Sequence, residues 1–193
     1  MTDELPTHRR TVTIEGVDLE GGFELTGTLM DERPWASSPS AVPLLHHLSL
    51  TLRIDAATMT ITDARAIMHT YPHEECPSIE PAFRSLIGLS IMRGYTRAVQ
   101  ERLGRQCGCS HLEFLARAMG PAAIQLVSSS ARRRGVTAIR PDEEERLDSW
   151  LVNTCHLWAD GGVGFEKESM NWHPGSDRYP APSVDELRRR HDA

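Results

Sequence analysis

The sequence predicts an α+β protein in which an antiparallel sheet of about four strands precedes a layer of about four helices. Two observations lead to this prediction. Before residue 72 apolar and polar residues alternate, which is typical of strands with one buried face. After residue 78 apolar residues recur at intervals of three and four, which is typical of amphipathic helices. Because the two patterns occupy separate parts of the chain, strands and helices are expected to form separate layers.

The strand-like part contains two expected hairpins. Residues 11–17 (TVTIEGV) and 21–32 (GGFELTGTLMDE) are predicted to form the first, and residues 46–55 and 58–72 the second. The apolar residues of the third segment share one face: Leu48, Leu50, Leu52 and Ile54. The adjacent pair His46-His47 is expected at a solvent-exposed edge of the sheet.

The helical part contains four segments with an apolar stripe. They cover residues 77–88, 95–104, 110–134 and 140–160. Ser78 and Ser110 are the expected N-caps, and Ser110 with Glu113 matches a capping box. In the third segment Gly120-Pro121 is expected to kink or break the helix.

Length and composition favour a single globular domain over residues 1–193, with residues 1–10 as a flexible start and residues 163–193 as an extended tail. Nothing in the sequence resembles a signal peptide or the roughly 20 apolar residues that span a bilayer. We therefore expect a cytoplasmic protein with no membrane partner. The net charge of −6 argues against a nucleic-acid partner.

The stretch GRQCGCSHLE, residues 104–113, places Cys107, Cys109 and His111 at alternate positions where a helix is expected to begin. A helix N-terminus favours the thiolate, which is the form of cysteine that binds metals and attacks electrophiles. In a reducing compartment, clustered thiols indicate metal binding or reactivity more strongly than a disulfide framework. This stretch is therefore the first candidate site.

The other two cysteines also lie near histidines or helix starts. Cys76 follows His73 in the stretch TYPHEECPSIE, and Cys155 precedes His156 on the expected buried face of the fourth helix. We predict a zinc or iron site, and its expected ligands are Cys76, Cys109, His111 and Cys155. Less favoured ligands are Cys107, His73 and His156. A metal-free reactive cysteine and purely structural thiols remain open.

Several short motifs lie within roughly residues 9–160: the RR near the start, the Tyr-Pro segment, Cys76-Pro77, Phe83 to Leu89, Gly94-Tyr95, Gly108 to Leu112, and Cys155 to Trp158. Together they resemble the motifs of DUF2889, a bacterial family of unknown function. The resemblance implies almost nothing about activity, but it supports treating Cys76, Cys109 and His111 as one site. Cys107 is not part of the usual family pattern.

The order of elements is also similar, in layout only, to the IscU-type iron–sulfur scaffold. This likeness implies ligands that converge at one exposed end, with an aspartate such as Asp63 among them. Three functions follow as hypotheses: a metalloprotein such as a metal-dependent enzyme, an accessory protein that carries a metal or cluster, and a cysteine-nucleophile enzyme with His111 or His73 as base. The catalytic residues are unknown, and the expected partner is a small-molecule substrate or another protein.

Overall fold

The computed structural model describes residues 5–36, 43–133, 153, 155–159, 161–170, 172, 177, 178 and 189. The chain divides into two compact units, Met1–Gly135 and Val136–Ala193, and each is described by itself. Among the described residues no helix is long and apolar enough to cross a membrane.

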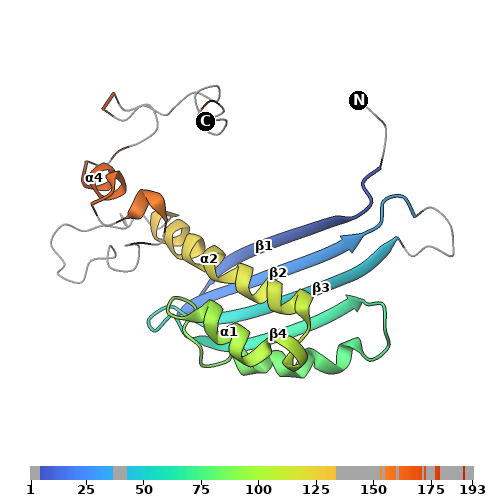
Figure 1. Ribbon diagram of the computed structural model, residues 1–193. Helices are drawn as coiled ribbons and strands as arrows, with labels where there is room; N and C mark the ends of the chain where they lie inside the picture. Colours follow the sequence, from blue (N-terminus) through green and yellow to red (C-terminus); the bar gives the residue numbers. More distant parts are fainter. Residues whose placement is uncertain are drawn as a thin grey trace. The chain divides into compact units, whose positions relative to one another are not determined.

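The first unit contains a four-stranded antiparallel sheet with the strand order β1-β2-β3-β4 (Figure 1). Its strands are β1 (Arg9–Leu19), β2 (Gly22–Glu32), β3 (Leu44–Asp55) and β4 (Ile61–Thr70). The α+β prediction is confirmed, and so are the two predicted hairpins. β2 and β3 are the inner strands, so their side chains have neighbours on both sides.

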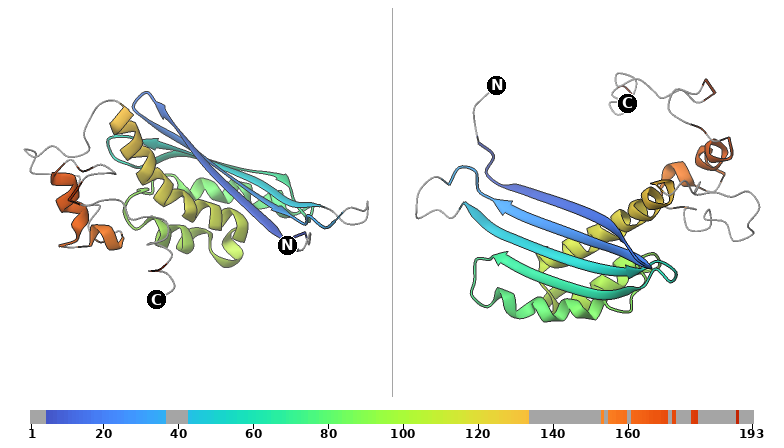
Figure 2. Two further views of the ribbon diagram at one scale, coloured as in Figure 1. Left: turned by 90° about the horizontal axis from the view of Figure 1, so that it is seen from above. Right: turned by 180° about the vertical axis from the view of Figure 1, so that it is seen from behind.

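The helices of this unit follow the sheet in sequence. They are η1 (Cys76–Leu86), α1 (Tyr95–Leu103), the short η2 (Arg105–Cys107) and α2 (Ser110–Arg133). They lie on one face of the sheet, and the view from behind shows the strands of the other face uncovered (Figure 2). The layered arrangement expected from the two sequence periods is therefore present.

Two helix starts differ from their predictions. The segment η1 is a 3-10 helix whose N-cap is Glu75, so Ser78 lies inside it. Pro81 also lies inside η1, and it has no N–H to donate to an α-helical ladder. In α2 the carbonyl oxygen of Cys109 accepts a bond from the Glu113 N–H at 2.8 Å, so the cap position falls one residue before Ser110. α2 continues through Gly120 and Pro121 as one element.

The core lies between the sheet and α2. The strand residues Leu29, Leu48, Leu50 and Leu52 are fully buried, as are Leu112, Leu115 and Met119 of α2. Gly27 and Gly16 let α2 approach β2 and β1 closely. A Cβ at Gly27 would lie 2.9 Å from Leu115 Cδ1, and one at Gly16 would lie 2.5 Å from Leu126 Cδ2. The missing side chains therefore set how deeply α2 sits on the sheet.

The second unit contains η3 (His156–Trp158) and α4 (Val163–Ser169). The helix α4 lies where extended chain was expected, and the rings of Trp158 and Phe165 meet in a T-shaped arrangement with centroids 5.2 Å apart. Most of the predicted fourth helix lies outside the described residues. Its end is not α-helical, because Asn153 has a φ of 62° and Cys155 is extended at a φ of −156°. Cys155 is also exposed, so its predicted place on a buried helical face is wrong.

Candidate metal centre

A row of polar residues crosses one end of the sheet. Arg10 of β1 pairs with Asp31 of β2, and Asp31 pairs in turn with His46 of β3. The next row inward on the same face is apolar and consists of Val12, Leu29 and Leu48. Since side chains alternate between faces, Asp31 continues the buried stripe of its strand. A carboxylate therefore occupies a core position, and only 1% of its residue surface is exposed.

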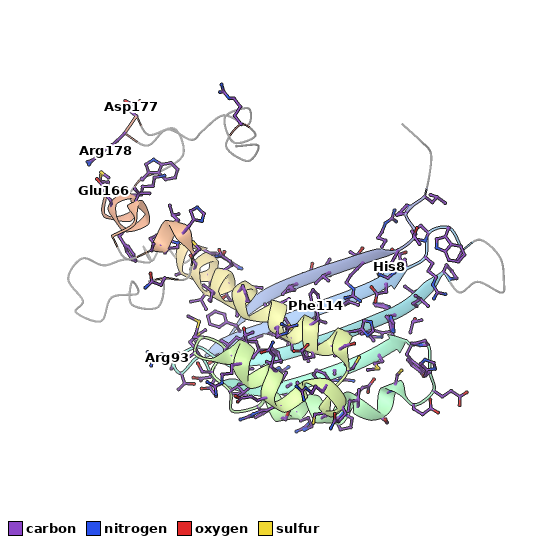
Figure 3. The ribbon with its side chains drawn as sticks, viewed as in Figure 1. His8, Arg93, Phe114, Glu166, Asp177 and Arg178 are labelled. Carbon is purple, nitrogen blue, oxygen red and sulfur yellow. The ribbon has the colours of Figure 1, made fainter. Side chains whose placement is uncertain are left out.

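Both carboxylate oxygens of Asp31 are contacted from several sides. Oδ1 accepts a hydrogen bond from Arg10 Nε at 2.7 Å and lies 3.2 Å from His8 Nε2. Oδ2 accepts from Arg10 Nη2 at 2.8 Å and lies 3.1 Å from His46 Nδ1 and 3.5 Å from His111 Nε2. The Arg10 guanidinium also lies 5.5 Å from the centre of the Phe114 ring, and Figure 3 shows His8 near the end of β1 and Phe114 on α2. The Arg10 side chain is thus held in place by Asp31 and Phe114.

His111 reaches this row from the first turn of α2. Its ring stacks on that of His46, with centroids 3.9 Å apart and planes inclined by 32°. One ring nitrogen, Nε2, faces Asp31, and the other, Nδ1, lies 3.7 Å from the Sγ of Cys109. His111 therefore links the cysteine at the helix start to the buried carboxylate.

Asp31, His46 and His111 form the only group in the described part of the chain whose three potential metal donors all lie within 4.8 Å of one another. Burial raises the pKa of Asp31, but the hydrogen bonds and charge of Arg10, together with His111 and His46, hold it below its ordinary value. Burial and the neighbouring His46 lower the pKa of His111. At neutral pH Asp31 is therefore ionised and His111 neutral, which are the forms that bind metals.

The structure does not bring all of the predicted ligands together. His111 belongs to the three-donor group, and Cys109 touches it through the far nitrogen of the ring. Cys76 begins η1 and packs half-buried against the core, while Cys107 is exposed at the end of η2. Neither cysteine belongs to the three-donor group, nor does His73. Cys155 and His156 lie in the Val136–Ala193 unit.

Asp31 and His46 were not identified as site residues from the sequence, although the sequence pattern indicates that both are on a buried face. Asp31 follows Leu29 by two residues and His46 precedes Leu48 by two, so each keeps the phase of a buried stripe. The expectation of a solvent-exposed edge is wrong for His46, because β3 is an inner strand and this residue is on its covered face. His47 belongs to the opposite face, where its ring stacks on His69 at 4.5 Å.

The comparison with protein families agrees with the resemblance seen in the sequence. The family model of DUF2889, described as a protein of unknown function, matches residues 8–125. The chain belongs to this family. The matched range includes His8, Arg10, Cys109 and the three-donor group, whereas Cys155 lies beyond it. Neither the search of curated proteins nor the search of solved structures gave a match.

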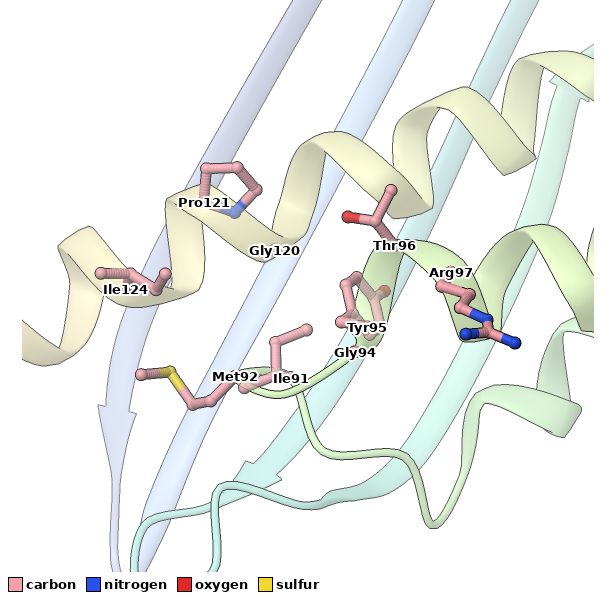
Figure 4. A pocket seen from close by; sticks show the side chains of 9 residues that line it. All are labelled: Ile91, Met92, Gly94, Tyr95, Thr96, Arg97, Gly120, Pro121 and Ile124. Carbon is pink, nitrogen blue, oxygen red and sulfur yellow. The ribbon is translucent and has the colours of Figure 1, made fainter. Parts of the chain in front are cut away.

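A pocket of about 370 Å³ lies apart from this group, between α1 and the middle of α2. Ile91 and Met92 line it from the segment before α1, and Pro121 and Ile124 line it from α2 (Figure 4). Tyr95, at the start of α1, is only 4% exposed. Its hydroxyl is buried without a hydrogen-bond partner among the residues that the structure describes.

Replacing Tyr95 with Phe is expected to stabilise the protein by about 1 kcal/mol, because a buried unpaired hydroxyl is costly and Phe keeps the ring. Burial raises the pKa of Tyr95, whereas an unfolded tyrosine ionises near pH 10. The wild type should therefore lose stability as the pH rises above about 10, and the Phe variant should lose less.

Urea unfolding at about pH 8 and about pH 10.5 would measure both effects. Tyr71→Phe is the matched control, since Tyr71 is 41% exposed. A Tyr95→Phe variant less stable than the wild type at both pH values would show that the hydroxyl does have a partner.

Proposed function

We propose that the protein binds one divalent transition-metal ion, zinc or iron(II), through Asp31, His46 and His111. The observation that supports this most is the convergence of one carboxylate and two imidazole donors within 4.8 Å. Two histidines and one carboxylate are the donor set of catalytic zinc sites and of non-haem iron(II) sites. Three protein donors leave positions on the ion for water or a small-molecule substrate, which favours an enzyme-like site.

The burial of Asp31 supports the same proposal. A buried carboxylate destabilises a fold unless it is paired, and even a paired one is often less favourable than an apolar side chain of similar size. Asp31 stands at the end of a stripe that includes Phe23, Leu25 and Leu29, where a leucine would pack. A charged side chain at such a position indicates a role other than stabilising the fold.

The contacts of Arg10 are compatible with a bound metal. A carboxylate has about four lone-pair positions, and Arg10 uses one on each oxygen. The two histidines converge on the Oδ2 side, where a further lone pair is available to an ion. Arg10 would then orient Asp31 from outside the coordination sphere, as second-shell partners of metal ligands do.

The donor set also bears on the kind of metal group. Iron–sulfur clusters are held mainly by cysteine thiolates. The three-donor group contains no cysteine. It therefore favours a single ion over a cluster.

Metal analysis tests the proposal directly. Protein purified without chelator is expected to carry about one zinc or iron per chain, and His46→Ala and His111→Ala should each lose most of it. His47→Ala is the matched control, because it removes the neighbouring histidine from the opposite face of the same strand. Equal metal content in His46→Ala and His47→Ala would contradict the proposal, as would metal-free wild type from zinc- and iron-supplemented cultures.

A second function, a metal-free cysteine nucleophile, is favoured by one observation. Cys109 Sγ lies 3.7 Å from His111 Nδ1, and His111 Nε2 lies 3.5 Å from Asp31, which is the order of a nucleophile, a base and an orienting carboxylate. This function gives His46 no role. It predicts that chelator-treated protein is alkylated faster at Cys109 than at Cys107, and that His111→Ala but not His46→Ala removes the difference.

A further inference from the structure

We propose that Cys109 is a positioning residue that accepts a hydrogen bond from His111 and so directs the other ring nitrogen of His111 at the metal. This inference rests on the metal site proposed above and adds a residue to it. In this role Cys109 does not touch the ion.

The two ring nitrogens of His111 face different partners. Nε2 of His111 lies 3.5 Å from Asp31 Oδ2, while Nδ1 lies 3.7 Å from Cys109 Sγ. An ion held between Asp31 and His46 must therefore be bound through Nε2. The sulfur is on the side of the ring that faces away from that ion, so it is placed to contact the ligand and not the metal.

The hydrogen bond would select one form of the imidazole. A neutral histidine carries one N–H, and when Nδ1 holds it the lone pair of Nε2 is free to bind a metal. With the proton on Nδ1 and donated to sulfur, Nε2 and the Asp31 carboxylate present lone pairs to each other. These repel unless a cation lies between them, so this form of His111 is suited to a bound metal.

The backbone fixes Cys109 relative to His111. The Cys109 carbonyl is bound by the Glu113 N–H at 2.8 Å, which attaches it to the first turn of α2. The chain before it turns tightly, since a Cβ at Gly108 would lie 2.2 Å from the Leu103 carbonyl oxygen. The backbone positions that carry the thiol and the imidazole therefore belong to the same helix start.

The expected effect is moderate because sulfur is a weak acceptor. Removing an outer-shell partner of a metal-binding histidine typically costs 10- to 100-fold in affinity, and the lower end, about tenfold, is expected for Cys109→Ala. Cys109→Ser keeps an acceptor and should recover most of the loss. Cys107→Ala, two residues earlier, should bind as the wild type does. Zinc affinity would be measured by competition with a chromophoric chelator, and melting curves would report whether each variant is folded.

Two spectroscopic readings separate this role from a merely structural one. In zinc-loaded protein, nitrogen NMR should show His111 with its proton on Nδ1, and the proton should become less strongly hydrogen-bonded in Cys109→Ala. In cobalt-loaded wild type, no thiolate-to-cobalt charge-transfer band should appear.

Three results would overturn the inference. One is a charge-transfer band that disappears in Cys109→Ser, because it would make the thiolate a ligand. Another is wild-type affinity in Cys109→Ala, which would leave the metal site itself intact. The third is a Cys109→Ser variant no better than Cys109→Ala although both are folded. Failure of the wild type to bind zinc or cobalt would instead overturn the proposed function, and this inference with it.

Discussion

Replacing Arg10 with Met and Asp31 with Leu in one chain is expected to give a protein at least as stable as the wild type that binds no metal. Leucine at position 31 would continue the stripe of Phe23, Leu25 and Leu29, and methionine would replace the aliphatic stem of Arg10 with an apolar side chain near Phe114. Exchanging a buried ion pair for apolar side chains of similar volume is often neutral or stabilising. This double variant should therefore keep its stability while it loses metal binding.

The single variant Arg10→Met is expected to be less stable than the wild type. It leaves a carboxylate that is 2% exposed without its guanidinium, which costs about 3–5 kcal/mol for a fully buried pair. Since the Arg10 side chain is 35% exposed, we expect a smaller loss, about 2–3 kcal/mol at neutral pH. The pKa of Asp31 is held below its ordinary value, so the pair stabilises the fold above about pH 4 and this stabilisation is lost as the pH falls through the folded-state pKa.

Urea unfolding would compare the free energy of unfolding of the wild type, the single variant and the double variant. Metal content would be measured on the same samples. A double variant as unstable as Arg10→Met would show that the polar row supports the fold. A double variant that retains metal would show that the ion is held elsewhere.

The elements of the sheet and the helix layer could be predicted because their signals are local. The alternation of Leu48, Leu50 and Leu52 in β3 and the spacing of Leu112, Leu115 and Met119 in α2 each follow from one segment of sequence. These apolar positions are buried as their periods require. No pairing between segments was needed to assign them.

The site could be predicted only in part because it depends on pairing. His111 could be chosen from its place at a helix start, but Arg10, Asp31 and His46 become neighbours only through the register of three strands. Knowing that β3 is an inner strand would have shown that His46 does not lie at an edge of the sheet. The cysteines were chosen for their chemistry, and among those described in the Met1–Gly135 unit Cys109 is the one that contacts the group, through His111.

Replacing Gly27 with Val is expected to weaken both the fold and the metal site, because the seating of α2 on β2 sets the position of His111. A Cβ at Gly27 would lie 2.9 Å from Leu115 Cδ1 and 3.1 Å from Met119 Sδ, and valine adds two methyl groups beyond it. Overpacking of this kind typically costs about 1–3 kcal/mol. Since His111 begins the same helix, lifting α2 should also move Nε2 away from Asp31 and lower zinc affinity about tenfold, the size seen when the support of a ligand is lost.

The neighbouring change Thr28→Val is the matched control, because it places the same side chain one residue further along β2, on the face without helices. Adding Leu115→Ala to Gly27→Val makes room for the new side chain under α2. The double variant should therefore lose less stability than the two single variants added together, and it should regain zinc affinity. Additive losses, or a Gly27→Val protein that binds zinc as tightly as Thr28→Val, would show that the contact of α2 with Gly27 does not determine where His111 lies.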